Sequence, residues 1–225
     1  TLAQLQTEVQ IARVFVDLAE ESGKPPTPHS PPEDFPAAPP KPGLLATLLA
    51  APTCAPGNPV PPPGSLVIGG PGQGKTTLVQ YLCQLHRACI LRHHRAALDP
   101  PQIEALDELG ARSERDKLAP HTPRVPFFIV LRDLAAWLAK NPSIATTDAV
   151  LAHVAARIHE STEVTLPLTD LAIFVTRGPW LLVLDGLDEV PGTGGRGTTL
   201  TAINTFVERF AGTSHHVVAT TRPQG

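Results

Sequence analysis

The chain has 225 residues, of which 42% are hydrophobic, and this is enough for one α/β domain with additional segments. Its net charge of −3 lacks the basic excess that gathers DNA or RNA, so we expect no direct nucleic-acid partner. Its apolar runs are much shorter than the roughly 20 residues of a membrane helix, so we expect no membrane partner. Three irregularly spaced cysteines do not make a disulfide framework, which favours the reducing cytoplasm.

The first 63 residues divide into two segments. Residues 1–24 have apolar side chains at helical spacing and predict an amphipathic helix, which packs either on a partner or on its own domain. Residues 25–63 contain 15 prolines, which remove amide donors and predict an extended linker, interrupted by a short helix at Leu44–Leu49. Because the chain contains no Met, we also expect it to be part of a longer protein.

Residues 64–225 alternate apolar strands with helices. The strands are expected at 65–68, 126–131, 180–184 and 216–221. The helices are expected at 76–88, at 148–158 with Thr146 or Thr147 as its cap, at 169–176 and at 200–210. Continuous apolar strands separated by helices are typical of a parallel sheet that is covered on both faces, so the fold class is α/β.

A glycine-rich loop joins the first of these strands to the following helix. Its residues are Gly-Gly-Pro-Gly-Gln-Gly-Lys-Thr, which fits the phosphate-loop pattern, and with Thr77 the nucleotide-binding residues are Gly69, Gly70, Pro71, Gly72, Gln73, Gly74, Lys75, Thr76 and Thr77. Glycines let backbone amides approach phosphate oxygens, and the helix N-terminus adds a positive dipole end. Lys75 supplies charge to the β- and γ-phosphates, and Thr76 offers a hydroxyl to Mg²⁺. The loop therefore predicts a nucleoside triphosphate, most simply ATP, with Mg²⁺.

Two further strand ends carry charged residues. The run Leu-Leu-Val-Leu-Asp-Gly-Leu-Asp-Glu places Asp185 at the carboxyl end of a buried strand, where parallel sheets bind ligands, and we expect it to hold Mg²⁺ beside Thr76. Either Asp188 or Glu189 is then placed to polarise the attacking water. Arg222 follows the strand 216–221 at the same edge and is expected to contact the γ-phosphate.

In order, these motifs resemble a NACHT domain, which belongs to the STAND class of signalling ATPases related to AAA+ proteins. The resemblance covers residues 64–225 and is most specific at Asp-Gly-Leu-Asp-Glu, where Gly186 follows the metal-binding Asp and the acidic pair comes later. It implies a three-layer P-loop NTPase sandwich that is closed and monomeric with ADP. It also implies that ATP opens the protein for oligomerisation, in immunity or programmed cell death. In the family, helical and winged-helix domains follow the Arg strand.

Several alternatives remain beside the slow ATPase switch. A nucleotide-binding interaction module with negligible turnover would use the same residues. A conventional AAA+ motor is disfavoured because Gly186 stands where a motor has Glu. Arg132, after the strand 126–131, is placed to approach phosphate or a neighbouring subunit. A metal site is not expected at Cys83, His86, Cys89 and His93, because these would spread along a helix; we expect free thiols and surface imidazoles there.

Overall fold

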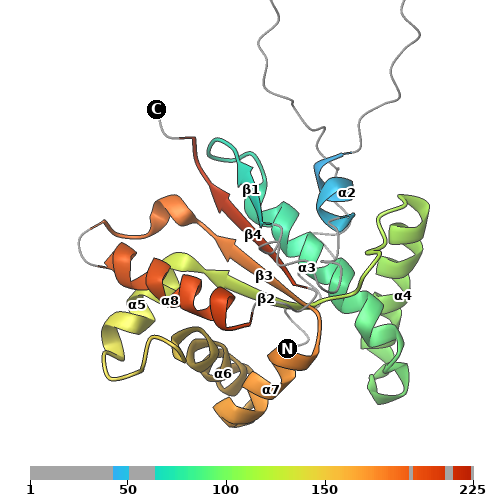
Figure 1. Ribbon diagram of the computed structural model, residues 1–225. Coiled ribbons are helices and arrows are strands. Elements are labelled where there is room, and N and C mark those ends of the chain that lie inside the picture. The colour runs from blue at the N-terminus through green and yellow to red at the C-terminus, as the bar shows by residue number, and fades with distance from the viewer. Residues whose placement is uncertain (1–42, 51–63, 193–194, 211–214, 224–225) are drawn as a thin grey trace, which may run out of the picture.

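The computed structural model describes residues 43–50, 64–192, 195–210 and 215–223 (Figure 1). The helix expected over 1–24 and most of the proline-rich segment 25–63 lie outside the described residues. Within that segment, α2 (Leu44–Leu49) forms as expected and buries Leu45, Leu48 and Leu49.

The centre of the domain is a four-stranded sheet in which every pair of neighbouring strands is parallel. Its strands are β1 (Gly64–Ile68), β2 (Val125–Val130), β3 (Trp180–Asp185) and β4 (His216–Thr221). Their order across the sheet is β1-β4-β3-β2, so β4 lies between β1 and β3. All four strands were predicted to within one residue at each end, and the parallel sheet is confirmed.

Helices cover both faces of this sheet (Figure 1). They are α3 (Lys75–Arg92), α4 (Pro100–Arg115), α5 (Leu131–Lys140), α6 (Ala149–Thr162), α7 (Leu168–Arg177) and α8 (Gly195–Arg209), with 3-10 turns η1 (Arg95–Ala97) and η2 (Leu187–Glu189). None of the helices in the described part of the chain is long and apolar enough to cross a bilayer.

Strand β3 shows how one run of apolar residues serves two cores. Its side chains point alternately to opposite faces, as a strand requires. Leu181 and Val183 pack with α2 and α3, whereas Leu182 and Leu184 pack with α5, α6, α7 and α8. Every residue of β3 is buried, which explains why the strand has no polar alternation. The α/β architecture with helices on both faces is thereby confirmed.

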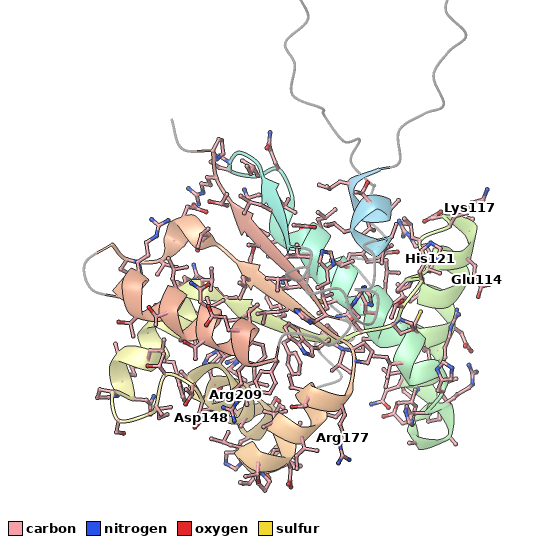
Figure 2. The ribbon with its side chains drawn as sticks, viewed as in Figure 1. Glu114, Lys117, His121, Asp148, Arg177 and Arg209 are labelled. Atoms are coloured by element: carbon pink, nitrogen blue, oxygen red, sulfur yellow. The ribbon has the colours of Figure 1, made fainter. Side chains whose placement is uncertain are left out.

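The structure corrects three local expectations. Helices α4 and α5 were not predicted, and Leu131 begins α5 rather than ending β2. The cap of α6 is Asp148 rather than Thr146 or Thr147, and it makes no side-chain capping bond. The Asp148 carboxylate instead accepts a hydrogen bond from Arg209 at 2.6 Å, and Figure 2 shows these two side chains together.

The third correction concerns the histidine and cysteine residues of α3. His86 is buried, at 0% exposure, so it is not the surface imidazole that was expected, whereas His93 is exposed. Cys83 and Cys89 are both thiols rather than disulfide partners, as expected, although Cys83 is buried. The His86 Nδ1 accepts a hydrogen bond from the backbone N–H of Arg124 at 3.1 Å, which fixes the ring inside the domain. The described residues contain no group of three or more His, Cys, Asp or Glu arranged to hold a metal ion.

Candidate functional site

The phosphate-loop residues connect the carboxyl end of β1 to the start of α3. Gly72 and Gly74 have φ angles of 75° and 72°, in the left-handed region that side chains with a Cβ rarely adopt. The backbone N–H of Gly69 donates to the carbonyl of Thr221 at 3.2 Å, which ties the loop to the end of β4. Gly74 precedes α3 and makes no side-chain cap, so the first amides of α3 are available to an anion.

Lys75 lies within this loop. Its Nζ donates to the carbonyl oxygens of Gly69 and Gly70 at 2.6 and 2.9 Å. The Gln73 side-chain oxygen accepts a hydrogen bond from the Gly70 N–H, which bends the loop back on itself. Among the described residues, these two carbonyl groups hold the ammonium group on the loop, which leaves its charge available to a phosphate.

The loop and the acidic strand end meet at Thr76 and Asp185. The Thr76 hydroxyl donates to Asp185 Oδ2 at 2.9 Å, although the two residues are 109 positions apart. The other carboxylate oxygen, Oδ1, accepts from the Thr220 hydroxyl at 2.6 Å. Asp185 is only 8% exposed, so both oxygens have partners in a buried setting.

This pair of oxygen groups fits a magnesium ion. Mg²⁺ prefers oxygen ligands, is bound by one or two protein groups, and takes its remaining ligands from water and substrate phosphates. Thr76 supplies a hydroxyl and Asp185 a carboxylate at one point of the sheet edge. The Thr76 hydroxyl keeps its lone pairs while its proton is donated to Asp185, so it can still face a cation.

Beside this pair, the acidic turn η2 and Arg222 form an ion-pair network. Arg222 Nε lies 3.0 Å from Asp188 Oδ2, and the Arg222 backbone N–H donates to Asp188 Oδ1 at 3.1 Å. Glu189 makes longer contacts, at 3.5 Å to Arg222 Nη2 and 3.4 Å to Arg132 Nη1. Glu189 is therefore held more loosely than Asp188. Gly186, with φ 83°, makes the bend that brings η2 back to the sheet edge.

Most of the predicted site residues therefore lie at one edge. Thr76 contacts Asp185, Arg222 contacts Asp188 and Glu189, and Lys75 contacts the loop carbonyls. The side chains or backbones of Pro71, Gly72, Gln73, Gly74, Thr76 and Thr77 are exposed on the loop and the helix start. Two contributors were not foreseen in these roles. Thr220 was interpreted only as part of an apolar strand, and Arg132 was expected to approach phosphate or a neighbouring subunit, whereas it contacts Glu189. The signal that the sequence offered for Thr220 was a polar residue within an otherwise apolar strand end, but the sequence did not show which strand lies beside it.

A second polar cluster lies at the opposite edge, where the strands begin. It consists of His86, Arg124, His215 and His216, all at 0% or 1% exposure. His216 Nε2 is 3.0 Å from Ser65 Oγ, and His215 stacks on Trp180 at 4.5 Å between ring centroids. Burial, then the charges of Arg124 and His216, lower the pKa of His86 to about 3. Burial, then Arg124 and His215, lower the pKa of His216 to about 4.

Comparison of the chain with protein-family models, with curated proteins and with solved structures finds no match in any of the three, so its function has to be argued from the geometry of this edge.

Proposed function

We propose that this chain binds ATP with Mg²⁺ at the carboxyl edge of its sheet and hydrolyses it slowly. The observation that carries the proposal is the hydrogen bond between Thr76 and Asp185. A glycine-rich loop alone is a common turn, and an aspartate after a strand is a common turn residue. Their convergence from 109 positions apart is what a phosphate-bound cation requires.

Each charged group then has a distinct task. The amides of the loop and of the α3 N-terminus hold phosphate oxygens, and Lys75 adds a mobile positive charge. Mg²⁺ would be held by Thr76 and Asp185, and it would neutralise charge on the β- and γ-phosphates. Arg222 is placed to contact the γ-phosphate, from a side chain that is 50% exposed.

We assign the base to Glu189 rather than Asp188. Asp188 accepts a hydrogen bond from the Arg222 backbone, forms an ion pair with its guanidinium and is 20% exposed, so it serves to orient that arginine. Glu189 is 36% exposed and its ion pairs are 3.4 and 3.5 Å long, so its carboxylate is freer to accept a proton from water.

The motif order and the position of Gly186 support a NACHT-like role for this site. In that role the nucleotide state controls self-association, with ADP favouring a closed monomer and ATP an oligomer in an immune or cell-death response. The site supplies a physical basis, because Arg222 contacts both Asp188 and Glu189 and would have to exchange these partners for a γ-phosphate. The trigger and effector would come from other segments, in the cytoplasm.

A second candidate is nucleotide binding with negligible turnover. It is favoured by the same ion pairs, because a carboxylate that is engaged by both Arg132 and Arg222 is less free to turn toward a water molecule. In this case the nucleotide would stabilise the domain and its contacts without being consumed. Phosphate release by the purified chain separates the two candidates.

The first test is nucleotide binding by the purified chain with Mg²⁺, comparing ATP, ADP and GTP by calorimetry. We expect adenine nucleotides to bind, and Lys75→Ala to weaken ATP binding by roughly 10- to 100-fold, because the phosphate charge loses its partner. Lys140→Ala is the matched control, since Lys140 is an exposed lysine at the end of α5.

Two outcomes of this binding experiment would contradict nucleotide binding at this edge. A folded chain that binds none of the three nucleotides, or a Lys75→Ala variant that binds ATP as tightly as Lys140→Ala, would overturn it.

A further inference from the structure

The end of β4 contacts every other part of the candidate site. Because β4 lies between β1 and β3, its last residues reach both neighbours. The Thr221 carbonyl accepts from Gly69 of the loop, and Arg222 pairs with Asp188. Thr220, between these and the strand interior, contacts Asp185. Of these three residues, only Thr220 places its side chain against the metal-binding carboxylate.

The Thr220 hydroxyl is committed in both of its hydrogen-bonding capacities. Its oxygen accepts from the Gly186 backbone N–H at 2.9 Å, and its proton is donated to Asp185 Oδ1 at 2.6 Å. A hydroxyl has one proton, so the bond from Gly186 fixes the direction in which that proton points. Thr220 is 1% exposed, and water therefore does not compete for these bonds.

The resulting series of hydrogen bonds has one direction. It runs from Gly186 to Thr220, then to one oxygen of Asp185, while Thr76 donates to the other oxygen. With both oxygens occupied, the carboxylate of Asp185 has a single orientation. The Thr76 proton is then directed at Asp185, which leaves the lone pairs of Thr76 for a cation.

We infer that Thr220 is a positioning residue that orients Asp185, and through it Thr76, for binding of the Mg²⁺ that accompanies the nucleotide. The inference rests on the proposed nucleotide function of this edge. Its chemical requirement is a hydroxyl at position 220, in addition to a side chain of the right shape. Removal of such outer-shell partners typically weakens metal binding by 10- to 100-fold.

The test compares Thr220→Val, which keeps the shape and removes the hydroxyl, with Thr220→Ser, which keeps the hydroxyl. Binding of a fluorescent ATP analogue to the full chain is titrated with Mg²⁺, and binding in EDTA is measured separately. We expect Thr220→Val to raise the half-saturating Mg²⁺ concentration by at least tenfold while binding in EDTA changes less than threefold. Thr220→Ser should stay within threefold of the unmodified chain under both conditions.

A matched control is available in α8. Thr199 is also 1% exposed, and its hydroxyl donates to a backbone carbonyl, that of Gly195. Thr199→Val therefore removes a buried hydroxyl away from the site and should leave the Mg²⁺ midpoint unchanged. If Thr220→Val does not fold, Thr220→Cys provides a weak donor at the same place and should give an intermediate midpoint.

The outcomes distinguish this inference from the function on which it rests. An unmodified chain that binds no nucleotide overturns the proposed function. An unmodified chain with Mg²⁺-dependent binding, beside a Thr220→Val variant with the same Mg²⁺ midpoint, overturns the inference alone. Equal weakening in Mg²⁺ and in EDTA also overturns it, because the role of Thr220 would then be structural.

Discussion

The two edges of the sheet hold their charged and titratable side chains in different environments. At the carboxyl edge, Asp188, Glu189, Arg132 and Arg222 pair acid with base, and the side chains are between 20% and 63% exposed. At the amino edge, the cluster around Arg124 joins an arginine to three histidines and is almost completely buried. One edge places its ion pairs in partial contact with water, and the other lowers the pKa of His86 and His216 through burial.

This difference indicates that the carboxyl edge serves chemistry and that the amino edge serves the stability of the fold. Paired charges near water can exchange partners at modest cost, because exposed ion pairs contribute at most about 1 kcal/mol. Buried neutral imidazoles are stable only while they remain neutral, so they contribute to the fold. We therefore expect substitutions at the carboxyl edge to change chemistry more than stability, and changes at the amino edge to do the reverse.

The largest expected effect is on turnover at the carboxyl edge. Glu189→Gln keeps the shape of the side chain and removes its ability to accept a proton, so the rate of phosphate release should fall by about 10²- to 10⁴-fold. ATP binding should stay within a few-fold, since neither Lys75 nor Asp185 is changed.

Asp188→Asn is the comparison variant for this prediction. Because Asp188 is bonded to Arg222, its replacement should weaken ATP binding more than Glu189→Gln does and slow turnover less. A larger rate loss in Asp188→Asn would exchange the roles of the two carboxylates.

The next effect belongs to the amino edge and is on stability in acid. An unfolded histidine has a pKa near 6.5, above the values of about 3 and 4 for His86 and His216 in the fold. Between pH 6.5 and 4 the unfolded chain therefore binds more protons, and the free energy of unfolding falls as the pH falls. The loss should be on the order of a few kcal/mol, measured by urea unfolding across this range.

His86→Asn sharpens the acid prediction, since its oxygen can still accept from the Arg124 N–H but does not titrate. The variant should lose part of the pH dependence between pH 6.5 and 4, whereas His121→Asn, at an exposed position, should not. If the free energy of unfolding depended equally on pH in the unmodified chain, in His86→Asn and in His121→Asn, the buried cluster would not control stability in acid.

The smallest effect concerns the bend after Asp185. Gly186→Ala forces a side chain into the left-handed region and brings a Cβ to 3.4 Å from the Glu189 carboxyl group, so it should destabilise by about 1–2 kcal/mol. Gly197→Ala, in an open helical position of α8, should instead stabilise by about 0.5 kcal/mol. Urea unfolding measures the free energy of unfolding of both variants. Equal changes in the two variants would contradict the strain that we expect at Gly186.

The strands were predictable because each is a short and mainly apolar run. Helix α4 was missed although its start carries a capping box, with Asp99 and Gln102 bonded to each other's backbone, and proline at its first position. Helix α5 gave no such signal, since it follows β2 without a loop and has no side-chain cap. Its first residue, Leu131, continues the apolar pattern of the strand, so local sequence could not place the boundary.

The sequence predicted which residues lie at the candidate site, but it predicted fewer of the contacts between them. Lys75, Thr76, Asp185 and Arg222 each follow from a local motif at a strand end. The pairing of Glu189 with Arg132 and of Asp185 with Thr220 depends on the order β1-β4-β3-β2, which arises from contacts between distant segments. No local pattern in the sequence carries that order.

The place of β4 between β1 and β3 also has a consequence for how the protein is made. Ser65 on β1 and His216 on β4 are hydrogen-bonding neighbours separated by 151 positions, and β4 is the only described strand that pairs with β1. During synthesis, the strand that carries the glycine-rich loop therefore cannot join the sheet until β4, which comes last among the described strands, has left the ribosome. Under the proposed function, we expect nucleotide to act late on the nascent chain, as a ligand that captures the sheet once β4 has paired with β1.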